Sequence, residues 1–347
     1  MIPSDPGSPV EQDRPVEPPT EPPRLGASTF TIEGRAAPGL FVVGWLATIV
    51  GIVAIVVALV AGQTVAATIL LVIGMFSLAI GLVAGAGSQG IERRARAGAE
   101  AEGRYTGPSP FLVFAASIPV TGLIVIGAGV LFDLVDVSVD GPLARLASVA
   151  ISAGVYSALI RLLVVDSGAL SWSAMGVHRP DGRALAELVT GALWAAPVIV
   201  ATLPVAWLVT QLVPVTPTSP LPPTGETVGL AINLLAGAIV APIGEELLFR
   251  GFATTAWARE IGERRGLVRA ALFFAAVHVL TISGESAGSA LGLALVAFAT
   301  RVPVALALGW LFVRRRTIWA PIGLHAAFNA ILLLIAEWAL QTPVRPG

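Results

Sequence analysis

The sequence predicts an all-α fold, a polytopic membrane helix bundle with about nine transmembrane helices. Of its 347 residues, 55% are hydrophobic and only 12% are charged, and the mean hydropathy is +0.84. A water-soluble core cannot hide that much apolar surface. Several apolar runs also approach or exceed the roughly 20 residues needed to cross a ~30 Å hydrocarbon layer. Arginines gather in every second connection between these runs, as expected of a multi-pass membrane protein.

The first segment, residues 1–36, is predicted to be a disordered, Pro-rich cytoplasmic tail. It is rich in Pro, Glu and Ser and lacks apolar periodicity, so it cannot bury enough surface to fold. It also lacks a basic region followed by a short apolar core, which argues against a cleaved signal peptide. We therefore expect the first apolar helix to serve as its own targeting signal.

Nine candidate spans follow this tail, and each is an apolar run of membrane-crossing character. They are residues 39–61, 64–86, 111–132, 143–165, 185–212, 227–252, 266–282, 288–313 and 318–340. We divide the chain after the tail into N-terminal transmembrane helices, residues 37–182, and a C-terminal transmembrane bundle, residues 183–347.

The distribution of arginine predicts how these spans are oriented. Arginines follow spans two, four, six and eight: Arg93, Arg94, Arg96, Arg104, Arg179, Arg183, Arg259, Arg264, Arg265, Arg314, Arg315 and Arg316. The alternate connections are nearly free of positive charge. Because cytoplasmic loops carry an excess of basic residues, we expect a multi-pass protein of the cell membrane with the N-terminus cytoplasmic and the C-terminus outside.

Composition also excludes several classes of function. A net charge of −1 argues neither for nucleic acid nor for an acidic partner, and we expect no nucleic acid. The chain contains no cysteine, which excludes disulfides, thiolate metal sites and a cysteine nucleophile. The expected surroundings are the lipid bilayer.

Ionisable and strongly polar side chains within the last four spans are the main candidates for function, since they are costly in lipid and are kept when paired or when they line a site. They are Glu245, Glu246, Arg250, His278, Arg301, His325, Asn329 and Glu337. The third histidine of the chain, His178, lies in a loop and is expected to be an ordinary surface residue.

The first cluster is the stretch GEELLFRGF, residues 244–252. Glu246 and Arg250 are four residues apart on a helix, so they share a face and are expected to form an ion pair. Glu245 is rotated by about 100° from Glu246 and can face a different neighbour. Pro242 tends to bend the helix, and Gly244 belongs to a stripe of small residues that allows another helix to approach closely.

In two further elements, two residues lie one helical turn apart, with alanines among the residues between them. FAAVH contains Phe274 and His278, and HAAFN contains His325 and Asn329. His325 and Asn329 can present two hydrogen-bond donors to one point, as an oxyanion site requires. Any one of these elements alone is more typical of helix packing, whereas three on successive helices indicate a site.

Two mechanisms fit these residue types. In the first, Glu245 is a general base that deprotonates water, His278 orients the water, and His325 with Asn329 stabilises the oxyanion. In the second, Glu245, His278 and His325 hold a zinc ion with water as the fourth ligand. We favour the first and expect no cofactor, because the chain has no HExxH motif.

The order EELLFR, FAAVH and HAAFN resembles the CAAX protease and bacteriocin-processing family (CPBP, or Abi), whose pattern is EExxxR, FxxxH and HxxxN. The resemblance covers about the last 120 residues. It implies an intramembrane endopeptidase related to the Ras-converting CAAX endopeptidase, acting on a membrane-associated or lipidated peptide or protein. It also implies that Glu245 activates water, that His278 assists it, and that His325 and Asn329 form the oxyanion site, with Glu246, Arg250 and Phe274 in support.

Two other functions stay open at this stage. A non-catalytic immunity or scaffold protein can keep these motifs while acting by binding, and a proton-coupled transporter can use the same carboxylates as carriers.

The sequence GESAG, residues 284–288, matches the GxSxG pattern of serine hydrolases, but it lies between two spans rather than on a strand, so we treat it as a chance match. Arg301 lies outside the family pattern. One hypothesis for its role is an ion pair with a carboxylate of the site.

Overall fold

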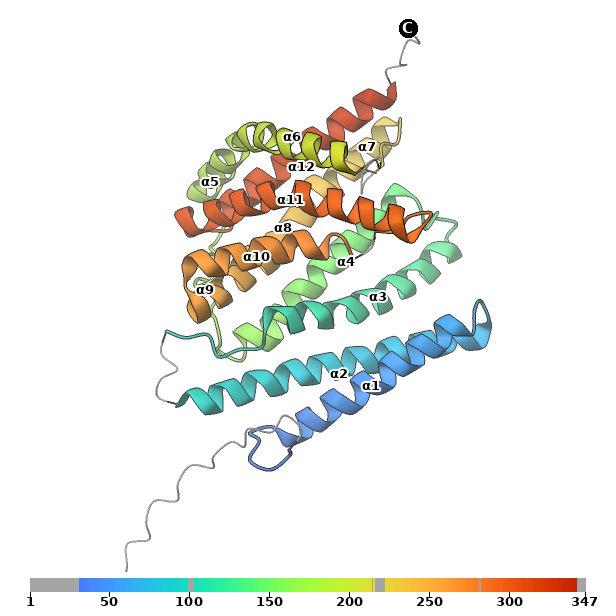
Figure 1. Ribbon diagram of the computed structural model, residues 1–347, viewed down its shortest axis with the longest axis vertical. Helices are drawn as coiled ribbons and strands as arrows, with labels where there is room; N and C mark the ends of the chain where they lie inside the picture. Colours follow the sequence, from blue (N-terminus) through green and yellow to red (C-terminus); the bar gives the residue numbers. More distant parts are fainter. Residues whose placement is uncertain (1–30, 99–102, 214, 216–221, 281, 342–347) are drawn as a thin grey trace, which may run out of the picture.

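A computed structural model describes residues 31–98, 103–213, 215, 222–280 and 282–341. In these ranges the chain is helical and forms no strand, so the all-α fold is confirmed (Figure 1). The predicted tail, residues 1–36, lies outside the described residues except for residues 31–36, which form turns before the first helix.

The α-helices are α1 (Pro38–Val60), α2 (Val65–Ala97), α3 (Pro110–Leu134), α4 (Pro142–Ile160), α5 (Gly182–Leu193), α6 (Ala195–Leu212), α7 (Thr227–Leu234), α8 (Ala241–Glu246), α9 (Thr255–Ile261), α10 (Glu263–Val277), α11 (Ala287–Arg315) and α12 (Trp319–Gln341). Three π-helical segments join some of these: η2 (Arg161–Val165), η3 (Leu235–Val240) and η4 (Leu247–Thr254). Within the described ranges, eight continuous stretches are long and apolar enough to cross a membrane, and the chain is a multi-pass membrane protein.

The seventh predicted span, residues 266–282, is shorter than expected. It corresponds to α10, which has 15 residues and stops at His278. At about 1.5 Å per residue, such a helix rises only ~22 Å and does not by itself cover a ~30 Å hydrocarbon layer. The apolar run in the sequence continues past His278, but the helix does not, and His278 caps its C-terminus.

The fifth and sixth spans are interrupted at particular residues. Trp194 separates α5 from α6 within the stretch Gly182–Leu212. The stretch Thr227–Ile261 is longer than the predicted span 227–252. Its hydrogen bonding switches from α-helical to π-helical and back at two places, η3 and η4. π-Helical turns inside α-helices are frequent at functional sites. Here they lie on both sides of α8, the short helix that carries the two glutamates.

The basic loops meet at one end of the bundle, to the left in Figure 1. Ion pairs connect three pairs of elements there: Arg93 Nη1 with Glu260 Oε1 at 2.6 Å, Arg315 Nη2 with Glu187 Oε1 at 2.7 Å, and Arg316 with Glu263. We call this the basic end. The structure thereby brings together loops that sequence alone relates only by their alternation, and which side of the membrane they face stays a prediction.

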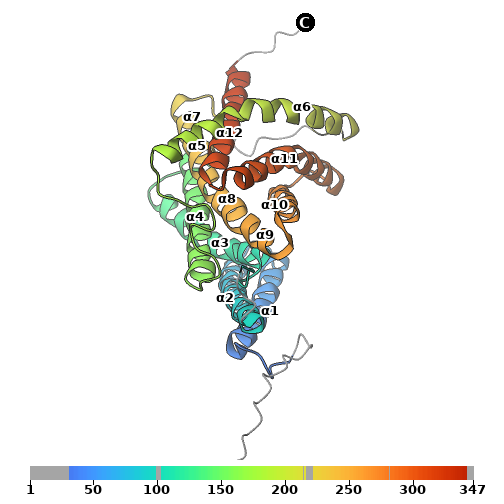
Figure 2. The ribbon, with the colours of Figure 1, turned by 90° about the vertical axis from the view of Figure 1, so that its left-hand side faces the viewer.

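α1 and α2 form a hairpin at the edge of the bundle, farthest from α6 and α12 (Figures 1 and 2). Glycine allows their backbones to approach closely. A Cβ atom on Gly51 would lie 2.6 Å from the backbone nitrogen of Leu78, so only glycine fits there. α8 lies at the centre of the bundle instead, between α4 and α12.

Candidate active site

Three elements meet around α8 to form the candidate site: α8 with its π-helical flanks, the C-terminal end of α10, and the first half of α12. Two glycines make this meeting possible. A Cβ atom on Gly244 would lie 2.6 Å from the Cβ atom of Ala153 in α4, and one on Gly323 would collide with the carbonyl oxygen of Leu188 in α5. Because each glycine lies within two residues of a predicted site residue, this close packing fixes where Glu245 and His325 lie. The tight contact predicted at Gly244 is thus present.

Glu246 is the centre of a buried network of charged groups. Arg250 Nη1 donates to Glu246 Oε1 at 2.9 Å, which is the ion pair that their spacing predicts. The same carboxylate oxygen accepts a hydrogen bond of 2.7 Å from Nδ1 of His325. Glu246 is 0% exposed and Arg250 1%. Since a buried charge is costly unless it is paired and hydrogen-bonded, Glu246 holds α8, η4 and α12 in one arrangement.

Phe274 covers this network from α10. The guanidinium carbon of Arg250 lies 4.3 Å from the centroid of its ring. The same ring lies 4.4 Å from the ring of His278 and 5.8 Å from that of His325, measured between centroids. Aromatic pairs at these separations are attractive, as is a cation over a ring face. Phe274 therefore covers the guanidinium of Arg250 and packs against the rings of both histidines.

Glu245 faces both histidines at the open side of the site. Its Oε2 atom lies 3.6 Å from Nε2 of His278 and 3.8 Å from Nε2 of His325. Its side chain is 23% exposed and that of His278 is 26% exposed, whereas Glu246 is fully covered. The two adjacent glutamates therefore differ in their surroundings as predicted: Glu246 is paired, and Glu245 meets the histidines.

The hydrogen bonds of the two histidines define which ring nitrogen carries hydrogen. Nδ1 of His325 bonds to the Glu246 carboxylate, and Nδ1 of His278 bonds to the carbonyl oxygen of Phe274 at 2.7 Å. Since both partners can only accept, the hydrogen is on Nδ1 in each ring. In the neutral histidines both Nε2 atoms are then acceptors, and both face Glu245.

Asn329 lies one turn beyond His325, as its spacing predicts, but its amide is engaged elsewhere. Nδ2 donates to the carbonyl oxygen of Gly237 at 2.8 Å. A π-helical N–H at position 242 would bond that carbonyl, but Pro242 has none. Asn329 therefore satisfies an acceptor that the proline frees, and it retains one further N–H group. Sequence reasoning missed this bond, because it spans 92 residues and depends on the π-helical turn.

Arg301 does not pair with a site carboxylate in the part of the chain that the structure describes. Its Nη1 atom donates to the carbonyl oxygen of Ala297 in its own helix at 3.0 Å. Glu337 is likewise outside the site, and it accepts hydrogen bonds from the backbone N–H groups of Thr224 and Gly225. His178 is exposed, as predicted. Ser286 of GESAG caps the N-terminus of α11 with its hydroxyl, so its role is structural.

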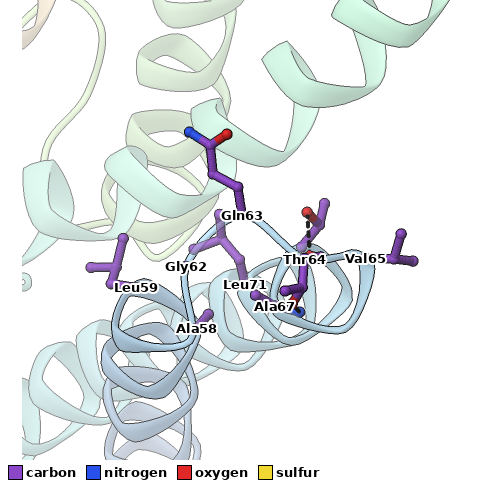
Figure 3. A pocket seen from close by; sticks show the side chains of 9 residues that line it. Ala58, Leu59, Gly62, Gln63, Thr64, Val65, Ala67 and Leu71 are labelled. Atoms are coloured by element: carbon purple, nitrogen blue, oxygen red, sulfur yellow. Dashed lines mark hydrogen bonds between the residues drawn. The ribbon is translucent and has the colours of Figure 1, made fainter.

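A surface groove of about 620 Å³ lies at the turn between α1 and α2 (Figure 3). Its lining is mainly apolar, with Gln63, Thr64 and Thr68 as its polar side chains, and Thr64 caps α2 through its hydroxyl. Since it contains no ionisable side chain, it has no evident means of catalysis. The polar cluster around Glu245 lies on other helices and is the better candidate site.

The described residues contain no group of three His, Cys, Asp or Glu side chains arranged so that they could hold a metal ion. Glu245, His278 and His325 come near each other, but two of the three also have other partners. Nδ1 of His325 is bonded to Glu246, and Nδ1 of His278 to Phe274. These bonds are of the kind that orient a histidine toward a metal as well as toward water.

Comparison with known proteins identifies one relationship. Residues 227–331 match the family model described as type II CAAX prenyl endopeptidase Rce1-like. The matched segment includes all three motifs and runs from the start of α7 into the middle of α12. No curated protein and no solved structure matches the chain. The resemblance noted from the motifs is thus confirmed for this segment, and α1–α6 lie outside it.

Proposed function

We propose that the chain is an intramembrane endopeptidase in which Glu245 activates the attacking water, because residues 227–331 match the model of the Rce1-like type II CAAX prenyl endopeptidase family. The substrate is a membrane-associated or lipidated peptide or protein that reaches the site within or beside the bilayer. Glu245 and His278 are partly exposed, whereas the ion pair behind them is covered. A substrate therefore meets the acid and the histidine first.

The observation that supports this mechanism best is the spacing of Glu245 Oε2 from the two Nε2 atoms. Distances of 3.6 and 3.8 Å are too long for direct hydrogen bonds, so these atoms stay available to a water molecule that lies beside them. All three atoms are acceptors when the histidines are neutral, so they do not bond one another directly. A water placed between them can donate one hydrogen to Glu245 and the other to a histidine.

Catalysis then follows general acid–base chemistry. Glu245 takes a proton from water while the water oxygen adds to the carbon of the scissile carbonyl. Glu245 then returns the proton to the amine as the C–N bond breaks. His278 accepts the other hydrogen of the water and holds it in line. The oxyanion is stabilised by His325 when its ring is protonated and by the second N–H of Asn329. Glu246, Arg250 and Phe274 position these groups without contacting substrate.

We further propose that the reaction takes place in the cytoplasmic half of the membrane. His325 is the seventh residue of the 23 in α12, counted from Trp319 at the basic end. At ~1.5 Å per residue this places it about 9 Å along the helix from that end. If the basic end faces the cytoplasm, the site is on the cytoplasmic side of the bilayer midplane.

A direct test compares purified wild-type protein with Glu245→Gln in proteoliposomes that contain a fluorogenic, lipidated peptide. The substitution removes the base and preserves the size of the side chain, so kcat should fall by about 10²–10⁴-fold. Glu285→Gln is the matched control, because Glu285 is an exposed acid in the loop before α11. Cleavage at the wild-type rate by Glu245→Gln would rule out the proposed base.

Two additional arms separate the alternatives. Metal analysis of active protein, with and without a chelator, distinguishes the glutamate mechanism from a zinc-dependent one. Rescue of a deletion strain by Glu245→Gln would favour the non-catalytic scaffold or immunity function instead, since only binding survives that substitution.

A further inference from the structure

Arg301 occupies an unusual position for a cation. It is the central residue of α11, with 14 residues of this helix on each side. It lies on the stripe that faces the bundle interior, since residues 4, 7 and 11 positions further along, Ala305, Leu308 and Phe312, are all buried. A guanidinium at the middle of a membrane-spanning helix is costly and is usually kept for function.

The same stripe of α11 contacts the candidate site one helical turn from Arg301. The carbonyl oxygen of Ala305, one turn away, accepts a hydrogen bond of 3.3 Å from Nη2 of Arg250. Ala305 also packs in the same hydrophobic cluster as Phe249 and Phe274. One turn further from the basic end, Arg301 is only partly buried, as are Glu245 and His278.

Few hydrogen-bond donors near Glu245 are free to meet a new negative charge. Nδ1 of each histidine is bonded to an acceptor, and each Nε2 carries no hydrogen in the neutral ring. Arg250 uses both Nη atoms and lies beneath Phe274. Asn329 has one N–H left after bonding Gly237. Among the described residues Arg301 has one hydrogen-bond partner, the carbonyl oxygen of Ala297, and a guanidinium offers five N–H groups.

The reaction proposed for Glu245 places a negative charge on the carbonyl oxygen of the substrate, and a cationic donor can bind this oxygen. As the water oxygen bonds to the carbonyl carbon, the π electron pair of the carbonyl moves onto its oxygen, and the water proton goes to Glu245. The negative charge thus passes from the carboxylate of Glu245 to the substrate oxygen. A fixed cation that faces this oxygen in a site of low dielectric stabilises the transition state more than the ground state.

We infer that Arg301 is a further catalytic residue, which donates hydrogen bonds to the oxyanion of the tetrahedral intermediate. This inference rests on the proposed function. It adds a permanent charge to the weaker donors His325 and Asn329. When the intermediate collapses, the oxygen re-forms the C=O bond, the C–N bond breaks, and the amine takes its proton from Glu245. Arg301 keeps all its protons throughout.

The test uses full-length protein in proteoliposomes, with Arg301→Gln and Arg301→Lys compared with wild type. The matched control is Arg145→Gln, since Arg145 is a partly buried arginine in the first turn of α4. For Arg301→Gln, kcat should fall by about 10²–10³-fold while KM changes by less than about threefold. Arg301→Lys should lie between Arg301→Gln and wild type, because it keeps the charge and loses the paired donors.

A second readout is the affinity for a phosphinic peptide, whose tetrahedral anion mimics the intermediate. Its Kd should rise by about the same factor as kcat falls, and Arg145→Gln should leave both unchanged. An unchanged kcat in Arg301→Gln overturns the inference. So does a loss seen with free-acid peptides but not with amidated ones, which would mean that Arg301 binds the substrate's terminal carboxylate.

The two proposals fail in different ways. If Glu245→Gln keeps wild-type turnover, the proposed function is wrong whatever Arg301 does. If Glu245→Gln is inactive and Arg301→Gln cleaves at the wild-type rate, only the role of Arg301 is wrong. The melting temperature in detergent and the share of protein that elutes as a single peak in size-exclusion chromatography report the folded fraction of each variant, so a loss of folded protein is not mistaken for a loss of turnover.

Discussion

Nδ1 of His325 and Oε1 of Glu246 lie 2.7 Å apart, although the two residues are 79 positions apart in the sequence. The same oxygen accepts the hydrogen bond from Arg250. Glu246 therefore has two partners on two elements, and it orients the ring of His325 so that Nε2 faces Glu245 at 3.8 Å. The second glutamate of the pair acts through this histidine, and its role is one of positioning.

The first prediction concerns Glu246→Gln. This substitution leaves Arg250 as an uncompensated buried charge, so the free energy of unfolding should fall by about 3–5 kcal/mol. Cleavage should fall as well, because the neutral amide oxygen of glutamine is a weaker acceptor than the carboxylate that orients His325. The measurements are the melting temperature in detergent and kcat per folded protein.

The double variant Glu246→Gln/Arg250→Met provides the control for that prediction. It removes both charges, so most of the stability should return while kcat stays low. Recovery of kcat together with stability would contradict the positioning role, because it would show that the pair serves the fold alone.

A second prediction concerns the contact between α8 and α4. In Gly244→Ala the new Cβ atom would lie 2.6 Å from the Cβ atom of Ala153, so α8 must shift and displace Glu245. A displacement of about 1 Å at a catalytic group can reduce turnover 10²-fold. Gly154→Ala is the matched control, because no atom lies within 4 Å of a Cβ atom there. Adding Ala153→Gly should restore part of the rate, and a rate unaffected by Gly244→Ala would show that the contact is not needed.

The same residues show how far sequence reasoning reaches. The pairing of Glu246 with Arg250 follows from helical spacing, and the exposure of Glu245 follows from its rotation on the helix. The bond from His325 to Glu246 does not, because it depends on how α12 packs against α8. That packing is set by contacts such as Gly323 against Leu188, and spacing along one chain carries no information on them.

Two further features could not be predicted from the sequence: the end of α10 at His278 and the π-helical turns. Apolar periodicity continues through these residues in the sequence, and it cannot distinguish α- from π-helical hydrogen bonding over a single turn. Both features place site residues: His278 lies at the end of α10, and η3 presents the carbonyl of Gly237 to Asn329.

Asn329 is the subject of a third prediction. Asn329→Asp removes the donor and places a carboxylate oxygen against the carbonyl oxygen of Gly237, so it should lower both stability and kcat. Asn329→Ala loses the same hydrogen bond without this repulsion. We expect Asn329→Asp to be the less stable of the two, with kcat reduced at least about tenfold in both. Equal melting temperatures for the two variants would argue against the bond to Gly237.

A fourth prediction separates the α1–α2 hairpin from the chemistry. In Gly51→Ala the Cβ atom would lie 2.6 Å from the backbone nitrogen of Leu78, so the hairpin must open or shift. Overpacking of this kind costs about 1–3 kcal/mol, and the melting temperature should fall. Gly39→Ala, in the same helix but with nothing within 4 Å, should not lower it. Since the site lies on other helices, kcat per folded protein should match wild type in both, and a selective loss of kcat in Gly51→Ala would mean that the hairpin contributes to the reaction.

The fifth prediction tests the orientation of the chain, and it uses the absence of native cysteine. Gln63→Cys lies at the turn between α1 and α2, and Arg314→Cys lies near the end of α11 at the basic end. If the basic end is cytoplasmic, a membrane-impermeant maleimide should label Gln63→Cys in intact cells and Arg314→Cys only after permeabilisation. The cysteine-free parent protein reports background labelling. The opposite pattern would place the basic end outside, and with it Trp319 and the adjacent half of α12, so that substrates would have to reach Glu245 from the extracellular side.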